Sequence, residues 1–260
     1  MSGLSEGLWT HEEYCSALEE EVRRFAGVVE GVDPETPVTT CPGWVVAKLL
    51  KHVGIIYRWA EHIVRERAEK PVAFREVPVA LPEDAAGYPV WLAEGGEALV
   101  ATLRAAGGEA PVWSWGAERN AGFWARRMLH ESTVHRADAE ITLGREPRIE
   151  VPVAVDGVEE ALDNLLAAER FAEGFAELSR GGERLHFHAT DAGEAGEWTV
   201  TLASGGFTWE RGHGKGDVAV RATAADLLLM LYGRREPVGE RYEVFGDRAL
   251  LDAWRAKTKF

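Results

Sequence analysis

The residues best suited to chemistry are Glu131 and His135, which lie four positions apart within residues 124–139 (WARRMLHESTVHRADA). Four residues of an α-helix make about 400° of rotation, so the carboxylate and the imidazole are expected one turn apart on the same face. That spacing lets both side chains bind one ion. A metal site is therefore the first hypothesis.

A zinc-protease motif is the competing interpretation, because His130 and Glu131 are followed by His135. That motif needs two histidines four residues apart, whereas His130 and His135 are five apart and point about 140° away from each other on a helix. We therefore pair Glu131 with His135 and expect His130 to face elsewhere. Two ligands hold a divalent metal poorly, so a third is required. The best candidate is His52, in the apolar stretch 41–59, which also has a helical pattern.

The structural alternative is that His52 is a core histidine and that Glu131 and His135 form a surface pair, which stabilises a helix by about 0.3 kcal/mol. Against it, Glu131 lies among Trp124 and Met128, and a buried carboxylate needs a charge partner, which a metal supplies. Two imidazoles and one carboxylate leave coordination positions open for water or substrate. Zinc fits this set best, and nickel, iron and manganese also suit it.

Composition narrows the class of protein. The 260 residues include 43 acidic and 29 basic side chains, and the net charge of −14 would repel a nucleic acid. Only two cysteines are present, as expected of a reduced cytosolic protein. The longest apolar run, residues 227–232, is too short to span a bilayer, and the N-terminus lacks the pattern of a signal peptide. We expect a cytoplasmic protein, a monomer or homodimer, with no nucleic-acid or membrane partner.

Periodicity predicts two domains, with residues 1–146 helical and residues 147–260 of α+β type. Apolar residues recur every three to four positions in the first part, which indicates a four-helix bundle. The predicted helices cover residues 9–29, 42 or 43 to 70, 84 or 89 to 106, and 122–143, and residues 111–122 form an aromatic loop. In the second part, helices are predicted at 158–178, 223–232 and 247–257, and strands at 184–189, 197–202, 206–210, 217–222 and 242–245.

Several motifs together resemble one family. They are residues 40–44 (TCPGW), 51–54 (KHVG), 57–59 (YRW), 122–127 (GFWARR), 130–139 (HESTVHRADA) and 226–234 (DLLLMLYGR). The chain resembles the actinobacterial mycothiol-dependent maleylpyruvate isomerase family over nearly its whole length. The resemblance implies a DinB-like four-helix domain followed by a sterol-carrier-like α+β domain.

The resemblance also implies a function. His52, Glu131 and His135 match residues that bind a divalent metal, usually zinc, and the metal activates the thiol of mycothiol, a low-molecular-weight cosubstrate. The thiolate then isomerises a cis double bond, as in maleylpyruvate isomerase proper, or attacks another small electrophile, as in S-transferases. Arg234 matches an arginine that binds substrate carboxylate, a role that suits a guanidinium; its alternative is a surface arginine. Family membership does not specify the electrophile.

Other functions and residues stay open. The rival class is a non-catalytic protein that binds a metal and an apolar ligand, with Trp198, Phe207 and Trp209 lining a pocket. A third class is a hydrolase that uses metal-bound water. Cys41 could be a nucleophile, and its alternative is a small packing residue. Three arginines could bind an anionic thiol or form salt bridges: Arg126, Arg127 and Arg136. His186 and His188 share one face of a predicted strand and are interpreted as structural residues. No role is assigned to His213.

Overall fold

The structure is a computed structural model that describes residues 9–167, 178 and 181–258. The chain divides into two compact units, Met1–Pro147 and Arg148–Phe260. The first unit is a helical bundle, and the second is an α+β unit with a five-stranded mixed sheet, so the predicted fold class is confirmed. Among the described helices, none combines the length and the hydropathy that crossing a membrane requires.

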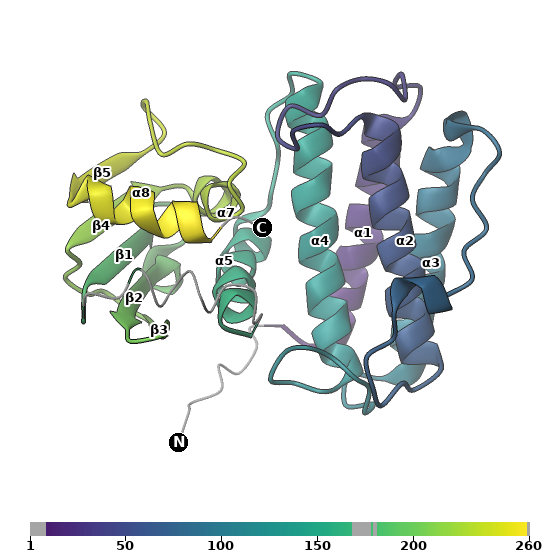
Figure 1. The fold of residues 1–260 in the computed structure, drawn as a ribbon, viewed down its shortest axis with the longest axis horizontal. Helices are drawn as coiled ribbons and strands as arrows, with labels where there is room; N and C mark the ends of the chain where they lie inside the picture. The colour runs from purple at the N-terminus through teal and green to yellow at the C-terminus, as the bar shows by residue number, and fades with distance from the viewer. Residues whose placement is uncertain (1–8, 168–177, 179–180, 259–260) are drawn as a thin grey trace. The chain divides into compact units, whose positions relative to one another are not determined.

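Four long helices make up the first unit, and Figure 1 shows them side by side. They are α1 (His11–Val29), α2 (Val46–Arg65), α3 (Tyr88–Ala106) and α4 (Ala121–Thr142), with short 3-10 turns η1 (Phe74–Glu76) and η2 (Ala85–Gly87) between α2 and α3. Helices α1 and α2 each pack against both α3 and α4. Apolar residues spaced at three to four positions, such as Leu18, Val22 and Phe25 of α1, form the buried core.

Capping residues set the ends of these helices. Thr10 and Glu13 form a capping box at the start of α1, in which the Thr10 hydroxyl accepts from the Glu13 amide and the Glu13 carboxylate accepts from the Thr10 amide. The Asn120 side chain accepts from the Phe123 amide at 3.1 Å and begins α4. Gly107, with φ of 74°, ends α3 in the left-handed region. The start of α4 fixes where Glu131 and His135 lie on that helix.

The predicted start of the second helix at residue 42 or 43 is wrong, because α2 begins at Val46 and ends at Arg65. Gly43, with φ of 79°, belongs to a turn in which the Trp44 amide donates to the Cys41 carbonyl. An isolated β-bridge between Pro37 and Val45 closes this turn. Thr40 and Cys41 therefore do not cap the helix, and their side chains are available for contacts with α4.

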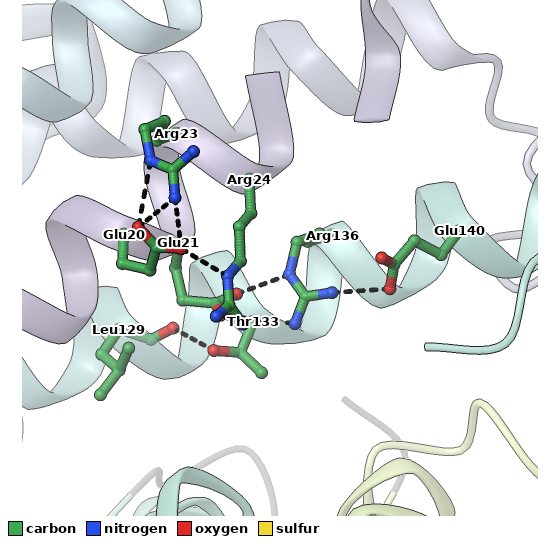
Figure 2. Close-up of polar contacts among 8 residues, drawn as sticks. All are labelled: Glu20, Glu21, Arg23, Arg24, Leu129, Thr133, Arg136 and Glu140. Carbon is green, nitrogen blue, oxygen red and sulfur yellow. Dashed lines mark hydrogen bonds and ion pairs between the residues drawn. The ribbon is translucent and has the colours of Figure 1, made fainter. Parts of the chain in front are cut away.

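A buried ion pair joins α1 to α4. Arg136 of α4 is 1% exposed, and its Nε and Nη1 atoms donate to Glu21 of α1 and to Glu140 of α4, each at 2.7 Å. Figure 2 shows Arg136 between these two carboxylates and also shows Arg23 and Arg24 bonded to Glu20. Of the alternatives considered for Arg136, the structure supports the salt bridge.

The second unit contains helices and one mixed sheet. Its elements are α5 (Val151–Ala167), β1 (Arg184–Ala189), η4 (Gly193–Gly196), β2 (Glu197–Ala203), β3 (Gly206–Arg211), β4 (Val218–Ala222), α7 (Ala224–Leu231), β5 (Glu243–Gly246) and α8 (Arg248–Lys257). The strand order is β3-β2-β1-β4-β5; β1 and β4 are parallel, and the other pairs are antiparallel. The five predicted strands and the last two helices are present with small changes at their ends.

The predicted helix at residues 158–178 begins earlier, at Val151. Pro152 lies in its first turn, where the missing backbone N–H of proline has no helical partner to lose. The later part of that prediction, residues 168–177, falls outside the described residues. Helix α5 packs against α7 and β3.

Candidate metal centre

The side chains of His52, Glu131 and His135 converge in the helical bundle. His52 comes from α2, and Glu131 and His135 lie one turn apart on α4, as their spacing predicts. Glu131 Oε1 lies 3.3 Å from His52 Nε2 and 3.2 Å from His135 Nε2. One ligand atom from each residue lies within 4.8 Å of the other two. We call these three residues the bundle cluster.

Asp138 orients His135. The Asp138 carboxylate is fully buried, and its Oδ2 atom lies 2.8 Å from His135 Nδ1. Its other oxygen, Oδ1, accepts from the Thr40 hydroxyl at 2.5 Å, and the Cys41 thiol donates to Oδ2 at 3.5 Å. The turn before α2 thus holds Asp138, and Asp138 holds the imidazole with Nε2 directed at Glu131. A carboxylate on the far nitrogen of a ligating histidine is a common feature of metal sites.

Arg127 holds the carboxylate of Glu131. It lies one turn earlier on α4, and its guanidinium donates to Glu131 Oε2, which leaves Oε1 for the two histidines. Sequence reasoning named a metal as the charge partner of Glu131, whereas the structure supplies Arg127 for that purpose. A metal is therefore not required to neutralise Glu131, and the case for one rests on the geometry of all three side chains.

Charges in the bundle cluster shift two pKa values. Burial alone favours neutral Glu131, but the charges of Arg127 and His135 outweigh burial and hold its pKa well below the usual range. Burial likewise favours neutral His135, yet Glu131 and Asp138 outweigh it and raise the pKa of His135 to about 9. Glu131 is thus ionised at neutral pH, and a bound metal would displace the proton from His135 Nε2.

Trp44 covers one side of the bundle cluster. Its ring meets the His52 ring edge-on, with centroids 4.9 Å apart, and lies nearly parallel to the His135 ring at 6.3 Å. The His135 side chain is 9% exposed, whereas that of His52 is 36% exposed. An ion held by these residues would therefore be reached from the His52 side.

The arrangement fits a divalent metal such as zinc. Four-coordinate zinc with bonds of about 2.0–2.1 Å places its ligand atoms about 3.3 Å apart. The two separations from Glu131 Oε1, 3.3 Å to His52 Nε2 and 3.2 Å to His135 Nε2, match that spacing. With three protein ligands, a coordination position stays open for an exogenous group, as in catalytic zinc sites.

Other residues singled out in the sequence lie as follows. His130 is fully buried and belongs to neither candidate metal group of the described bundle residues, which are the bundle cluster and the set of Cys41, His135 and Asp138. Arg234 follows α7 in the second unit, and its Nη1 atom donates to the Tyr232 carbonyl at 2.6 Å. Tyr57 is buried in the bundle, with its hydroxyl 2.7 Å from that of Ser132. Asp138 and Arg127 were assigned no place in the cluster by sequence reasoning, although both lie three or four residues from a cluster member on the helix.

We expect Asp138→Asn to weaken zinc binding by about 10–100-fold, because the amide no longer provides the negative charge that orients His135 and raises its basicity. Competition with a chromophoric chelator measures the affinity. Asp33→Asn is the matched control, since it makes the same charge change at an exposed position outside the cluster. An unchanged affinity in Asp138→Asn would show that His135 needs no orienting carboxylate.

Comparison with known proteins finds two matching domain profiles. Residues 15–140 match the profile described as "Mycothiol maleylpyruvate isomerase N-terminal domain", and residues 152–253 match "MDMPI C-terminal domain". A search of curated protein sequences returned no match.

Two solved structures share the fold. The crystal structure of the mycothiol-dependent maleylpyruvate isomerase is 16% identical over 91% of this chain and 93% of that chain, with a TM-score of 0.51. A histidine-to-alanine mutant of that isomerase is 15% identical over 87% of this chain and 90% of that one, with a TM-score of 0.50. Since the two profiles together cover most of the sequence, the chain belongs to the mycothiol-dependent maleylpyruvate isomerase (MDMPI) family.

Proposed function

We propose that this protein is a metal-dependent enzyme that uses mycothiol against a small electrophile, as an S-transferase or an isomerase. The observation that supports this most directly is the convergence of two imidazole nitrogens and one carboxylate oxygen at zinc-like spacing in a chain of the MDMPI family. Zinc is the proposed metal, and nickel, iron and manganese are the alternatives. As a user of a cellular thiol, the protein would act in the cytoplasm, as a monomer or homodimer, which gel filtration distinguishes.

The residues of the bundle cluster have distinct parts in this proposal. His52, Glu131 and His135 bind the metal, which when bound lowers the pKa of a thiol and stabilises the thiolate. Arg127 keeps one oxygen of Glu131 away from the metal, and Asp138 fixes the ring of His135. The His52 side chain is 36% exposed, and the thiol is proposed to approach from that side.

The thiolate then reacts in one of two ways. Addition of sulfur to one carbon of a cis double bond converts that bond to a single bond, which rotates before the C–S bond breaks and the double bond returns. This is the chemistry of maleylpyruvate isomerase proper. Alternatively, sulfur displaces a leaving group or opens a ring and the C–S bond persists, which is S-transfer.

Arg234 is proposed to bind a carboxylate of the substrate through its guanidinium. The hydrogen bond from Nη1 to the Tyr232 carbonyl restrains the side chain. If the proposal is right, Arg234→Gln raises KM for electrophiles that bear a carboxylate and leaves KM for neutral electrophiles unchanged. An equal change for both kinds of substrate would contradict it.

The non-catalytic alternative, a metal-bearing protein that holds an apolar ligand, has less support. Trp198 and Phe207 are buried, and the Trp198 and Trp209 indoles donate to Glu159 and Asp163 of α5. Trp198 and Phe207 are therefore core residues, and Trp209 is partly exposed and bonded to α5. Retention of a lipid through purification would favour this alternative.

The deciding experiment incubates zinc-loaded protein with mycothiol and a panel of electrophiles that includes maleylpyruvate, an epoxide and an activated halide. Products are followed by mass spectrometry and by absorbance. Isomerised maleylpyruvate would identify the isomerase, and a thiol adduct would identify an S-transferase. Metal-free protein and reactions with glutathione in place of mycothiol are the controls.

Two results would contradict the proposal. Conversion of an electrophile without any thiol would indicate a hydrolase that uses metal-bound water. Failure of zinc-loaded protein to bind mycothiol, measured by calorimetry, would remove the thiol from the mechanism altogether.

A further inference from the structure

A second cluster of histidines surrounds a carboxylate in the α+β unit. Glu197 Oε2 lies 3.1 Å from His186 Nε2 and 2.6 Å from His213 Nδ1, and Glu197 Oε1 lies 3.8 Å from His188 Nδ1. The His186 and His213 rings have centroids 5.2 Å apart, and those of His186 and His188 are 6.3 Å apart. We call these four residues the sheet cluster.

The sheet register brings three of these side chains to one face. His186 and His188 alternate on β1, and Glu197 is the antiparallel partner of His188 on β2. The intervening residue Phe187 pairs with Trp198, whose indole donates to Glu159 of α5, so these two rings lie on the opposite, helix-covered face. The sheet cluster is therefore a polar group on the face away from α5.

A glycine-rich loop, residues 212–216 (GHGKG), brings His213 to this face. The Gly212 amide donates to the Glu197 carbonyl at 2.9 Å. A Cβ atom on Gly214 would lie 2.3 Å from Thr199 Oγ1, and one on Gly216 would lie 2.5 Å from the Val218 carbonyl oxygen. Only glycine permits so close an approach of this backbone to the sheet. The loop thus holds its one histidine over His186.

The charges of the sheet cluster suit a cation. His186 is buried, and its Nε2 atom faces the Glu197 carboxylate. Both oxygens of the Glu197 carboxylate face imidazole nitrogens, Oε2 those of His186 and His213 and Oε1 that of His188. One carboxylate oxygen thus faces two imidazole nitrogens, and neutral imidazole with carboxylate is a ligand set for zinc and similar divalent metals.

We propose that His186, Glu197 and His213, whose ligand atoms all lie within 4.8 Å of one another, form a second site for a divalent transition metal, independent of the bundle cluster. The 3.1 Å separation of His186 Nε2 from Glu197 Oε2 is close to the roughly 3.3 Å between ligands of tetrahedral zinc. The shorter separation to His213 opens easily, because the His213 side chain is 79% exposed. A metal held by these three ligands fastens the 212–216 loop to β1 and β2.

The test counts zinc on untagged, full-length protein in which His52→Ala and His135→Ala have disabled the bundle cluster. After equilibrium dialysis, elemental analysis should find an equimolar amount of zinc. Cobalt in its place should give the intense visible absorption of a tetrahedral ion. Adding His213→Ala or Glu197→Gln should lower zinc affinity by more than about 100-fold. Loss of a residue that only hydrogen-bonds to a metal ligand costs about 10–100-fold, and loss of the ligand itself costs more.

Lys215→Ala is the matched control, because it alters an exposed side chain of the same loop and removes no donor; it should retain the metal. Zinc binding that is equal with and without His213→Ala and Glu197→Gln would overturn the proposal. So would protein that takes up no zinc once the bundle cluster is disabled, which would leave the sheet cluster a hydrogen-bonded group alone. Circular dichroism of each variant confirms that it is folded.

Discussion

Replacing His52 by alanine should remove zinc from the bundle cluster and abolish thiol-dependent turnover. With one of three ligands gone, zinc affinity should fall by more than the roughly 100-fold that an outer-shell change costs, and turnover should fall with it. His52→Ala is the cleanest single variant because His52 is the most exposed of the three, whereas Glu131→Gln leaves the Arg127 guanidinium without its carboxylate. Measuring zinc in the His213→Ala background ensures that only the bundle cluster is counted.

His135→Ala should behave like His52→Ala, and His130→Gln is the control. His130 is the histidine that the zinc-protease pairing would use, and it lies outside the bundle cluster. Zinc that is retained in His130→Gln and lost in the other two variants supports the three-residue site. The reverse pattern would contradict both the pairing of Glu131 with His135 and the proposed mechanism.

The helical period made most of the bundle cluster predictable. Glu131 and His135 are four apart on a helix whose start and end are marked by Asn120 and Gly144, so their common face follows from the sequence. Asp138 and Arg127 obey the same period, but periodicity alone does not say which polar neighbour bonds to which. That choice depends on tertiary contacts, such as the hydrogen bond from Thr40 to Asp138.

The sheet cluster was harder to predict. Alternation on a strand placed His186 and His188 on one face, but no third ligand was in view. Glu197 reaches His188 through the β1–β2 register, and His213 reaches His186 through the close packing of Gly214 and Gly216. Both contacts join residues from different segments, so neither follows from the repeat of a single helix or strand. The wrong prediction for the start of α2 has a local cause. Pro42 and Gly43 suit a turn as well as a helix N-terminus, and the sequence alone does not distinguish the two.

The largest expected change in stability follows from Arg136→Met. The Arg136 guanidinium bonds to Glu21 and Glu140 from a position that is 1% exposed. Removing it leaves the buried Glu21 carboxylate without this partner, and breaking a buried ion pair typically costs about 3–5 kcal/mol of unfolding free energy. Urea unfolding of the metal-free protein, followed by circular dichroism, measures the loss without the added stability of a bound metal.

Arg23→Ala is the control, because Arg23 also bonds to a glutamate of α1, but its side chain is 72% exposed and solvent screens the pair. Its unfolding midpoint should not change. In Arg136→Met the Glu21 carboxylate keeps its contact with Arg24 at 3.7 Å but loses its buried partner. The double variant Arg136→Met/Glu21→Met separates the cost of that buried charge from the cost of lost packing, since it removes both ends of the α1–α4 pair and fills the space with apolar atoms. Most of the lost stability should return in the double variant. If the double variant is no more stable than Arg136→Met, the guanidinium contributes through its packing and its bond to Glu140, and its pairing with Glu21 contributes little.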